Sequence, residues 1–384
     1  MNEVAEFNPK SELPDEFEYV DLESVVGTEM ISHRTETKDS APSRAQRLAQ
    51  PGDVFFQTVR PYQKNNYLFS KLDNNYVFST GYAQMRPNID TAFLMSFLQT
   101  DSFVKIVLDN CTGTSYPAIN SSDLSNLEIS LPKSFEEQKK VGKTIISIDN
   151  LITLHQRKCD ETKKLKKFML QKMFPKKDAK KPEIRFAGFT NDWEQRKLNE
   201  YLQVSKVKNK DAAFSKEDVL SVSGDYGIVN QIEFQGRSFA GVSVAAYGVV
   251  ETGDVVYTKS PLKSNPYGII KTNKGKTGIV STLYAVYKPL NNVHSEFVQI
   301  YFEQDARMNN YMHSLVNKGA KNDMKVSDEN ALKGEVFFPS KDEQIKISKY
   351  FGKIDHLIAL HQRKCDELKE FKKYMLQNMF PQKG

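Results

Sequence analysis

The chain has 384 residues, a formal net charge of +6 and 39% hydrophobic residues, which suits a globular protein of two domains. No apolar run approaches the ~18–20 residues that span a bilayer, so we expect no membrane partner. The three cysteines (Cys111, Cys159 and Cys365) are too few for a disulfide scaffold, and the first residues are acidic and polar, unlike a secretory signal, so we expect a cytoplasmic protein.

Residues 1–134 predict a first globular domain of mixed α/β structure. Strand-like stretches occur at 53–58, 76–80 and 127–131, and a helical pattern covers 91–108. Tyr, Asn, Ser and Gly are frequent, which is typical of a loop-rich recognition surface. This domain is acidic, because residues 1–132 carry a net charge of −8.

Residues 135–178 predict a long spacer helix. From residue 135 to 174 the sequence has no proline and one glycine, and Pro175 then ends the helix. Apolar or small residues recur in alternating steps of three and four, which is the seam of a helix that packs on another helix. The predicted seam residues include Ile145, Ile148, Ile152, His155 and Cys159.

Residues 179–340 predict a second mixed domain, and residues 341–384 predict a second spacer helix. The second seam includes Phe351, Ile354, Ile358, His361 and Cys365. The simplest partner for each seam is the other, which gives an antiparallel coiled coil of two helices. A helix of about 39 residues is roughly 58 Å long at ~1.5 Å per residue, so it suits a rigid spacer.

The two spacer helices are copies of one segment. Residues 151–175 and 357–381 are identical at 19 of 25 positions at a fixed offset of 206. Fainter matches join Gly52-Asp53-Val54 to Gly253-Asp254-Val255, so the whole unit is duplicated. The run from Pro182 to Leu198 has no counterpart before Asn2. We therefore expect a mixed α/β (α+β-like) fold of two globular domains on two long antiparallel helices, with pseudo-twofold repeat.

The spacing of His155 and Cys159, repeated at His361 and Cys365, raises the alternative of a metal site. Duplication of seam positions explains the same residues without a metal, so we predict none. The run Ser264-Asn265-Pro266-Tyr267 is similar to an adenine-gripping loop of amino-methyltransferases but lacks one proline. It is more typical of a turn before a strand, and no catalytic residue is predicted.

Basic side chains in the loops of both domains are the candidates for DNA binding, because Lys and Arg neutralise phosphates and Arg reads guanine edges. In the first domain they are Arg34, Lys38, Arg44, Arg47, Arg60 and Lys64, together with the loop residues Gly113, Thr114 and Ser115. In the second domain they are Lys206, Lys208, Lys210, Arg237, Lys259, Lys263, Lys271, Lys274, Lys276, Lys318 and Lys321, together with Asn322, whose amide could read adenine.

The layout resembles the specificity (S) subunit of type I restriction–modification enzymes. The resemblance rests on the duplicated segments Glu137 to Pro175 and Glu343 to Pro381, and on the Pro182–Leu198 and Gly113–Pro132 segments. It implies two target-recognition domains that each read half of a bipartite DNA site, with the helices as a ruler between them. It also implies a non-catalytic chain, with S-adenosylmethionine, ATP and magnesium held by two methyltransferase subunits and by restriction–translocase subunits, and no cofactor on this chain.

Two alternatives stay open from the residues alone. One is a self-contained DNA adenine methyltransferase or restriction enzyme, which needs a nucleotide-binding loop that the sequence does not reveal. The other is a structural coiled-coil adaptor that is indifferent to DNA sequence.

Overall fold

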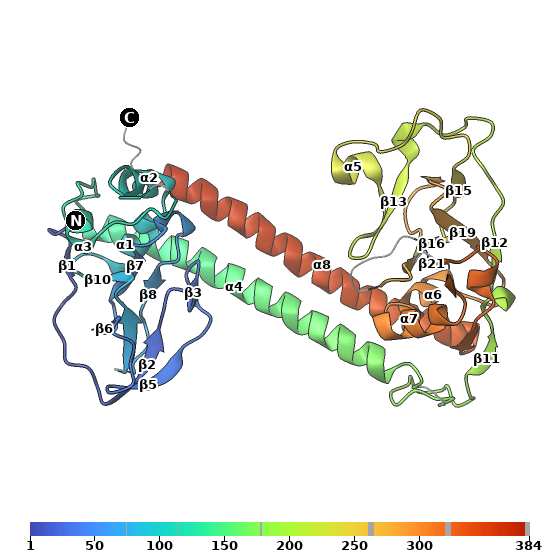
Figure 1. Cartoon of the computed structure of the whole chain (residues 1–384), viewed down its shortest axis with the longest axis horizontal. Helices are drawn as coiled ribbons and strands as arrows, with labels where there is room; N and C mark the ends of the chain where they lie inside the picture. The colour runs from blue at the N-terminus through green and yellow to red at the C-terminus, as the bar shows by residue number, and fades with distance from the viewer. Residues whose placement is uncertain (74, 114, 177–178, 260–264, 319–323, 381–384) are drawn as a thin grey trace. The chain divides into compact units, whose positions relative to one another are not determined.

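The computed structural model describes all residues except 74, 114, 177–178, 260–264, 319–323 and 381–384. It divides into two compact units, and both boundaries fall inside long helices. Unit 1 comprises Met1–Lys158 and Leu360–Gly384, and unit 2 comprises Cys159–Ala359. Each unit therefore holds one globular part together with segments of both helices, which are labelled α4 and α8 in Figure 1.

The first sheet of unit 1 carries the core of that unit. Its strand order is β1-β10-β7-β8, and all neighbours are antiparallel. Two short helices, α1 (Thr91–Leu98) and α2 (Asp101–Asp109), pack on it through Phe93, Phe97 and Phe103. The strands are β1 (Ala5–Phe7), β7 (Val54–Gln57), β8 (Tyr67–Leu68) and β10 (Tyr82–Pro87).

A second sheet of unit 1 has the order β5-β2-β9-β6, and its central pair β2–β9 is parallel. A small aromatic core is built from both sheets, and in it Phe55 of β7 stacks on Phe78 of β9 with ring centroids 3.7 Å apart. The strands are β2 (Glu16–Val20), β5 (Arg34–Thr37), β6 (Ala45–Leu48) and β9 (Tyr76–Ser79). The remaining elements are the hairpin β3 (Val25–Val26) and β4 (Glu29–Met30), the 3-10 turn η1 (Pro61–Gln63) and α3 (Ser121–Ser125).

Unit 2 repeats the first sheet of unit 1 with the order β12-β19-β16-β17. The strands are β12 (Leu202–Val204), β16 (Val255–Thr258), β17 (Ile269–Thr272) and β19 (Tyr284–Pro289). Helices α6 (Ser295–Tyr301) and α7 (Asp305–His313) take the places of α1 and α2. The register is also repeated, because Met85 pairs with Val54 as Tyr287 pairs with Val255.

The other elements of unit 2 are short. The strand pairs are β11 (Glu194–Lys197) with β22 (Glu335–Phe338), β13 (Leu220–Ser223) with β14 (Gly227–Asn230), β15 (Gly248–Val250) with β18 (Gly278–Val280), and β20 (Asn317–Lys318) with β21 (Met324–Lys325). The helical pieces are η2 (Leu198–Glu200), η3 (Lys216–Asp218), α5 (Gln231–Gln235) and η4 (Asn330–Leu332).

The repeated Gly-Asp dipeptide has a structural reason in each unit. Gly52 and Gly253 have φ angles of +96° and +92°, which L side chains rarely adopt. The aspartate that follows is buried and paired with the strand opposite: Asp53 binds Arg86 at 2.9 Å, and Asp254 binds Lys288 at 2.8 Å. The faint sequence repeat therefore marks a turn and a buried ion pair that both domains need.

The two long helices are α4 (Phe135–Lys172) and α8 (Lys341–Asn378), each of 38 residues. In unit 2 the Cys159 thiol points at the carbonyl of Ile358 at 3.8 Å. In unit 1 the repeat-related residues make the same contact, from the Cys365 thiol to the carbonyl of Ile152 at 4.0 Å. Each contact joins a late residue of one helix to an earlier residue of the other, as an antiparallel pair requires.

A second contact between the helices is also made twice. In unit 2 Lys166 Nζ lies 2.7 Å from Asp355 Oδ1, and in unit 1 Lys372 Nζ lies 2.5 Å from Asp149 Oδ1. These residues are again 206 apart, so the duplicated sequence supplies both partners of both pairs. The predicted mixed fold with a long antiparallel helix pair is confirmed.

Among the described residues, no helix by itself has the length and apolar character needed to cross a membrane. Helices α1 and α2, which meet at a bend of 66°, meet that standard of length and composition only when they are taken as one segment.

Candidate nucleic-acid interface

A turn and a loop in unit 1 bring an arginine and a tyrosine together. Arg60 and Lys64 flank the turn η1 with φ angles of +54° and +55°. The loop that ends at Ala118 is bridged to Val59, and the Arg60 amide donates to the Pro117 carbonyl at 2.8 Å. The Arg60 guanidinium then lies over the Tyr116 ring, 4.4 Å from its centroid.

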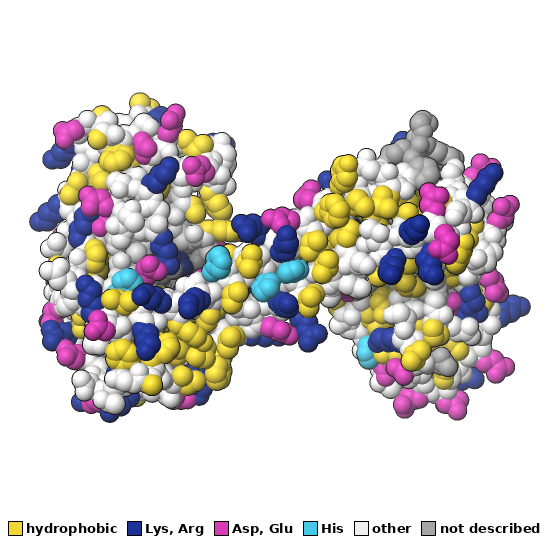
Figure 2. Space-filling view, turned by 180° about the vertical axis from the view of Figure 1, so that it is seen from behind, with side chains coloured by type: hydrophobic (Ala, Val, Ile, Leu, Met, Phe, Trp, Pro, Cys, Tyr) yellow, Lys and Arg dark blue, Asp and Glu magenta, His cyan; other side chains and the backbone are white. Residues whose placement is uncertain are grey.

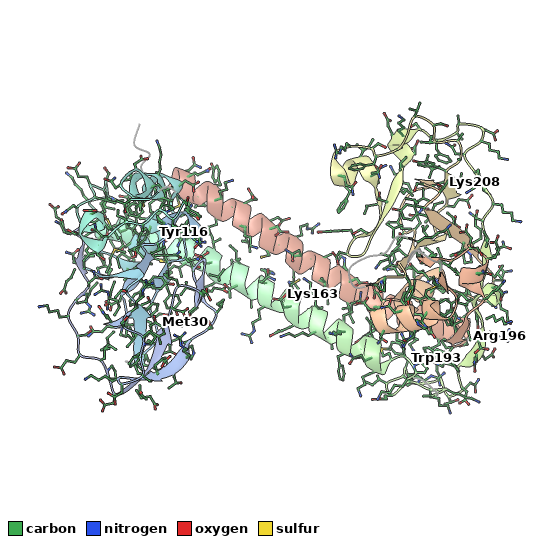
Figure 3. The ribbon with its side chains drawn as sticks, in the orientation of Figure 1. Met30, Tyr116, Lys163, Trp193, Arg196 and Lys208 are labelled. Carbon is green, nitrogen blue, oxygen red and sulfur yellow. The ribbon has the colours of Figure 1, made fainter. Side chains whose placement is uncertain are left out.

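This arrangement has the chemistry of a nucleic-acid contact. Tyr116 is 64% exposed, and Figure 3 labels it in the globular part of unit 1. An exposed aromatic face can stack on a base, while the guanidinium can bind phosphate or a guanine edge. Gly113 holds the loop in shape: its φ is +84°, and an added Cβ would lie 3.1 Å from the Tyr116 carbonyl oxygen. Ser115 is exposed in the same loop, and Thr114 lies outside the described residues.

Two other candidate cations of unit 1, Arg34 and Lys64, are already paired with carboxylates. Arg34 on β5 binds Asp21 at 2.9 Å and Glu36 at 2.8 Å, and these bonds raise its pKa. Lys64 is paired with Asp101 at 2.5 Å. A cation that is already paired with carboxylates gains less free energy from binding a phosphate. Arg34 and Lys64 are therefore less available for DNA binding than the sequence alone suggests.

Three further cations of unit 1 have no carboxylate within salt-bridge distance in the described part of the chain. Lys38 and Arg44 are exposed on loops next to β5 and β6. Arg47 on β6 is half-buried, burial lowers its pKa, and its Nε has no hydrogen-bond partner among the described residues. Because the unused Arg47 donor is buried, Lys38 and Arg44 are the more accessible phosphate contacts of the three.

Unit 2 presents its cations along an extended segment and on a small aromatic lobe. Lys206, Lys208 and Lys210 are exposed at alternate positions of one loop, and Lys208 is labelled in Figure 3. Arg237 lies over the ring of Phe239 at 4.6 Å, and Phe239 itself is exposed. The lobe formed by β13, β14 and α5 therefore repeats the pairing of arginine with an exposed ring that unit 1 shows.

The remaining candidates of unit 2 are less available. Lys259 is paired with Asp328 and Lys274 with Glu296, whereas Lys276 is exposed. Lys271 is buried 3.9 Å from Glu303, and burial lowers its pKa, so it belongs to the core. Lys263, Lys321 and Asn322 lie outside the described residues, and only the backbone of Lys318, on β20, is described.

Exposed aromatic residues are the part of this surface that sequence reasoning missed. Tyr116 in unit 1 and the pair Tyr226–Phe234 in unit 2, with ring centroids 5.0 Å apart, were not among the candidates. The available signal was an aromatic residue in a loop of small and polar residues, since the nearby arginine is brought to Tyr116 only by folding. On the face shown in Figure 2, Lys and Arg side chains lie among Asp and Glu side chains, so these local groupings matter more than net charge.

The seam residues lie on α4 and α8. Ile145, Ile148, Phe351 and Ile354 are buried, Ile152 and Ile358 are half-buried, and Cys159 and Cys365 are fully buried free thiols. His155 and His361 meet with their Nδ1 atoms 3.1 Å apart. No group of three or more metal-binding side chains occurs in the described part of the chain.

The outer faces of the two helices carry a second apolar row, which is also duplicated. Leu151 and Leu154 are exposed on α4, and Leu357 and Leu360 repeat them on α8. Two more exposed pairs follow the same offset of 206: Leu165 with Phe371, and Phe168 with Tyr374. Exposed lysines, among them the labelled Lys163 in Figure 3, lie beside this row. Large exposed apolar side chains at helical spacing are typical of a protein-binding surface.

Unit 1 also holds an open cavity of about 810 Å³ between the hairpin β3–β4, helix α1 and the first half of α4. Met30 of the hairpin, labelled in Figure 3, lines it together with Met95 and Ile145. Its polar side chains include Glu29, which hydrogen-bonds Thr153 of α4. The hairpin therefore packs against the spacer helix within this unit.

Comparison with known proteins bears on the choice between the alternatives. Residues 46–164 match the family described as the type I restriction modification DNA specificity domain. The predicted resemblance to type I specificity subunits is thereby confirmed, and neither the self-contained enzyme nor the structural adaptor is favoured.

Two curated proteins that are similar to parts of this chain have names of the same kind. The chain is 26% identical over 144 residues to the type I restriction enzyme HindI specificity subunit of Haemophilus influenzae, covering 36% of this chain and 31% of that protein. It is 32% identical over 124 residues to the MjaVIII specificity subunit of Methanocaldococcus jannaschii, covering 31% of this chain and 28% of that protein. The chain thus spans about three tenths of the length of each relative.

The fold is similar to that of a solved S subunit. The crystal structure of the type I restriction–modification S subunit from M. genitalium aligns with a TM-score of 0.62, over 100% of this chain and 95% of that chain. The sequence identity is 15%, so the likeness concerns the fold.

Proposed function

We propose that this chain is the DNA sequence-specificity subunit of a type I restriction–modification complex. The observation that carries the proposal is the duplication itself, seen in the two equivalent sheets and in the helix contacts that are made twice. Two related recognition domains in one chain suit a DNA site that consists of two half-sites. The specificity-domain match over residues 46–164 supports the same function.

Each globular part reads one half-site in this proposal. In unit 1 the reading surface centres on Arg60 and Tyr116, with Lys38, Arg44 and Arg47 as phosphate contacts. In unit 2 it centres on Arg237 and Phe239, with the lysines at 206, 208 and 210 as phosphate contacts. The two surfaces differ in residue and in loop, which suits half-sites of different sequence.

The same proposal assigns the domain boundaries. We propose that residues 1–134 and 179–340 are the two target-recognition domains, and that 135–178 and 341–384 are the spacer segments. Helices α4 and α8 of 38 residues, each about 57 Å long at ~1.5 Å per residue, then fix the number of unread base pairs between the half-sites.

The outer apolar rows on α4 and α8 are the docking sites for partner subunits in this proposal. Leu151 and Leu154 on α4 have equivalents at Leu357 and Leu360 on α8, so one chain offers the same face twice. Two copies of a methyltransferase subunit are the natural occupants of two equal faces. Restriction–translocase subunits join through that assembly, and the chain itself is a non-catalytic scaffold.

Catalysis is then divided between chains. S-adenosylmethionine, ATP and magnesium belong to the partner subunits, and this chain supplies the choice of sequence. The test reconstitutes the chain with its methyltransferase subunits and maps modified adenines by base-modification sequencing. A single bipartite motif is the expected result. Methyl transfer by the purified chain alone, from labelled S-adenosylmethionine to DNA, would overturn the division, and indifference to DNA sequence would favour an adaptor.

A further inference from the structure

The turn η1 in unit 1 presents polar side chains next to Arg60 in a fixed backbone conformation. The turn begins with Pro61, which is buried, and Arg60 and Lys64 on either side of it have positive φ angles. Two backbone hydrogen bonds close it, from the Gln63 amide to the Arg60 carbonyl at 3.0 Å and from the Lys64 amide to the Pro61 carbonyl at 3.1 Å. Residues other than glycine keep such φ angles only where the surrounding structure holds them.

The rest of unit 1 supplies this support at both ends of the turn. Lys64 Nζ lies 2.5 Å from Asp101 Oδ1 of α2, and the Lys64 carbonyl accepts a hydrogen bond from Gln99 Nε2 at 3.2 Å. At the other end the backbone amide of Arg60 donates to the Pro117 carbonyl at 2.8 Å. The side chains that η1 exposes are therefore held in one place beside the arginine–tyrosine pair.

A buried glutamine fixes the orientation of an exposed one in this turn. Gln57 on β7 is 3% exposed, and its Nε2 donates to the Val59 carbonyl at 2.5 Å and to Gln63 Oε1 at 2.8 Å. A carbonyl oxygen accepts only from a donor, so the amide nitrogen of Gln57 must face Val59. The acceptor atom of Gln63 must in turn face Gln57, and this settles which side of the Gln63 amide carries the oxygen.

This relay leaves two buried atoms unpaired. Gln57 Oε1 is buried without a hydrogen-bond partner among the described residues. Asn66 Oδ1 accepts from the Gln57 backbone amide at 2.9 Å, and its Nδ2 is then also buried without a partner in that part of the chain. Unpaired buried polar atoms destabilise a fold, so their presence beneath an exposed amide points to a functional reason for the arrangement.

Gln63 has the chemistry of an adenine reader. Its side chain is exposed, and within the described residues its Nε2 donates no hydrogen bond. In the major groove adenine presents the N7 acceptor and the N6 amino donor, and glutamine binds both at once through Nε2 and Oε1. Because an amide oxygen has two lone pairs, Oε1 can accept from the N6 amino group while it also accepts from Gln57.

We propose that Gln63 reads one adenine in the half-site that unit 1 recognises, and that Gln57 is its positioning residue. The inference rests on the proposed function and deepens it, because it assigns one base to one side chain. Arg60, three residues before Gln63 and 4.4 Å from the Tyr116 ring, supplies the cation on the same surface. The turn thus carries an amide for the base and a guanidinium for a phosphate or a guanine edge.

The test uses the full-length chain assembled with its methyltransferase subunits. Labelled duplexes in which each base pair of both half-sites is replaced in turn are titrated by fluorescence anisotropy, and the loss of affinity for each replacement is measured. For the wild type, replacing the adenine that Gln63 reads should weaken binding by about 5- to 150-fold. Gln63→Ala should abolish the loss at this one base pair and keep the losses at all others.

Three further variants separate base reading from a structural effect. Gln63→Glu keeps the acceptor for Gln57 but has no donor for N7, so the preference at the same base pair should shift from adenine toward cytosine, whose N4 amino group donates. Gln57→Leu and the shorter Gln57→Asn both free the Gln63 amide, and each should reduce the loss at that base pair alone, which a general folding defect does not do.

The matched control is Gln46→Glu, the same substitution at an exposed glutamine on β6, which should leave every loss of affinity unchanged. A selective wild-type complex in which both Gln63 variants keep every wild-type loss would overturn the role of Gln63 and leave the proposed function standing. An unchanged loss at that base pair in both Gln57 variants would overturn the positioning role. A wild-type complex that binds all duplexes equally would overturn this inference and the proposed function together.

Discussion

The Nδ1 atoms of His155 and His361 lie 3.1 Å apart, although the two residues are 206 positions apart in the sequence. At this distance one ring donates and the other accepts, so at least one ring is neutral. The two histidines are copies of one position in the duplicated helix, and each meets its own copy. The duplication of the helix, together with antiparallel packing, therefore accounts for this contact.

This contact predicts a pH dependence. Burial, followed by repulsion from His361, Lys158 and Lys364, lowers the pKa of His155 below its ordinary value of 6.5. A folded state with a lowered histidine pKa binds fewer protons than the unfolded state, so stability is full above 6.5 and falls as the pH drops through that value. Thermal melts between pH 8 and 5 should show the loss.

The control for this prediction compares how steeply the melting temperature falls with pH in different variants. A chain with His155→Gln and His361→Gln should lose less stability on acidification than the wild type. His356→Gln, on the exposed side of α8, should keep the wild-type slope. Equal slopes in the double variant and the wild type would show that the pair does not titrate on unfolding.

The two glycines of the helices should respond oppositely to alanine. A Cβ on Gly142 of α4 would lie 2.4 Å from the Phe93 backbone nitrogen of α1, whereas a Cβ on Gly352 of α8 meets nothing within 4 Å. Gly142→Ala should therefore destabilise unit 1 by about 1–3 kcal/mol, as overpacking does. Gly352→Ala should stabilise by about 0.5–1 kcal/mol through helix propensity. Denaturation monitored by circular dichroism checks both signs.

The aromatic ends of the helices should each stabilise a different unit. Phe174 packs on Phe297 in unit 2, and its repeat Phe380 packs on Phe93 in unit 1. Replacing either with alanine should cost about 3–5 kcal/mol. The single tryptophan, Trp193, contacts Phe174, so its fluorescence should change for Phe174→Ala and stay constant for Phe380→Ala. The exposed Phe371→Ala serves as the neutral control, and a fluorescence change from Phe380→Ala would contradict the assignment.

The arginine–tyrosine pair should matter for one half-site. Arg60→Ala should cost about 1–3 kcal/mol of DNA affinity and relax specificity in the half-site that unit 1 reads. Arg34→Ala is the matched control, because that side chain is already held by Asp21 and Glu36 and should contribute little. Titration of the assembled complex with site and non-site duplexes gives both values. Equal losses from the two variants would argue against the Arg60 surface.

The spacer helices should set the gap between half-sites. Seven residues inserted after Lys158 and seven after Ala359 fall at the boundaries between the units, so the pairs Lys166–Asp355 and Lys372–Asp149 stay intact. The insertion adds about 10 Å of helix at ~1.5 Å per residue. The unread gap should grow by about three base pairs at ~3.4 Å each. Modified-adenine mapping reads the new motif, and an altered half-site would contradict the ruler.

Much of this architecture could be predicted from spacing alone. Proline placement and the alternating seam predicted helices at the positions that α4 and α8 occupy, because helix packing is a local periodic property. The sheets were harder to predict, because strands such as β1 and β8 are short and pair with segments that are distant in the chain. The equivalence of the two sheets became visible only in the registers.

The candidate site likewise depends partly on the sequence pattern and partly on the tertiary structure. The sequence by itself determined the duplication, the helices, the seam and the resemblance to type I specificity subunits, because identity at a fixed offset and periodic patterns are properties of the chain order. It also named the basic residues of the loops. Only the tertiary structure decided that Arg34 is neutralised by Asp21, that Lys271 is buried near Glu303, and that Arg60 lies over Tyr116. The physical reason is that charge availability depends on neighbours that folding brings together from distant positions, and local pattern does not contain them.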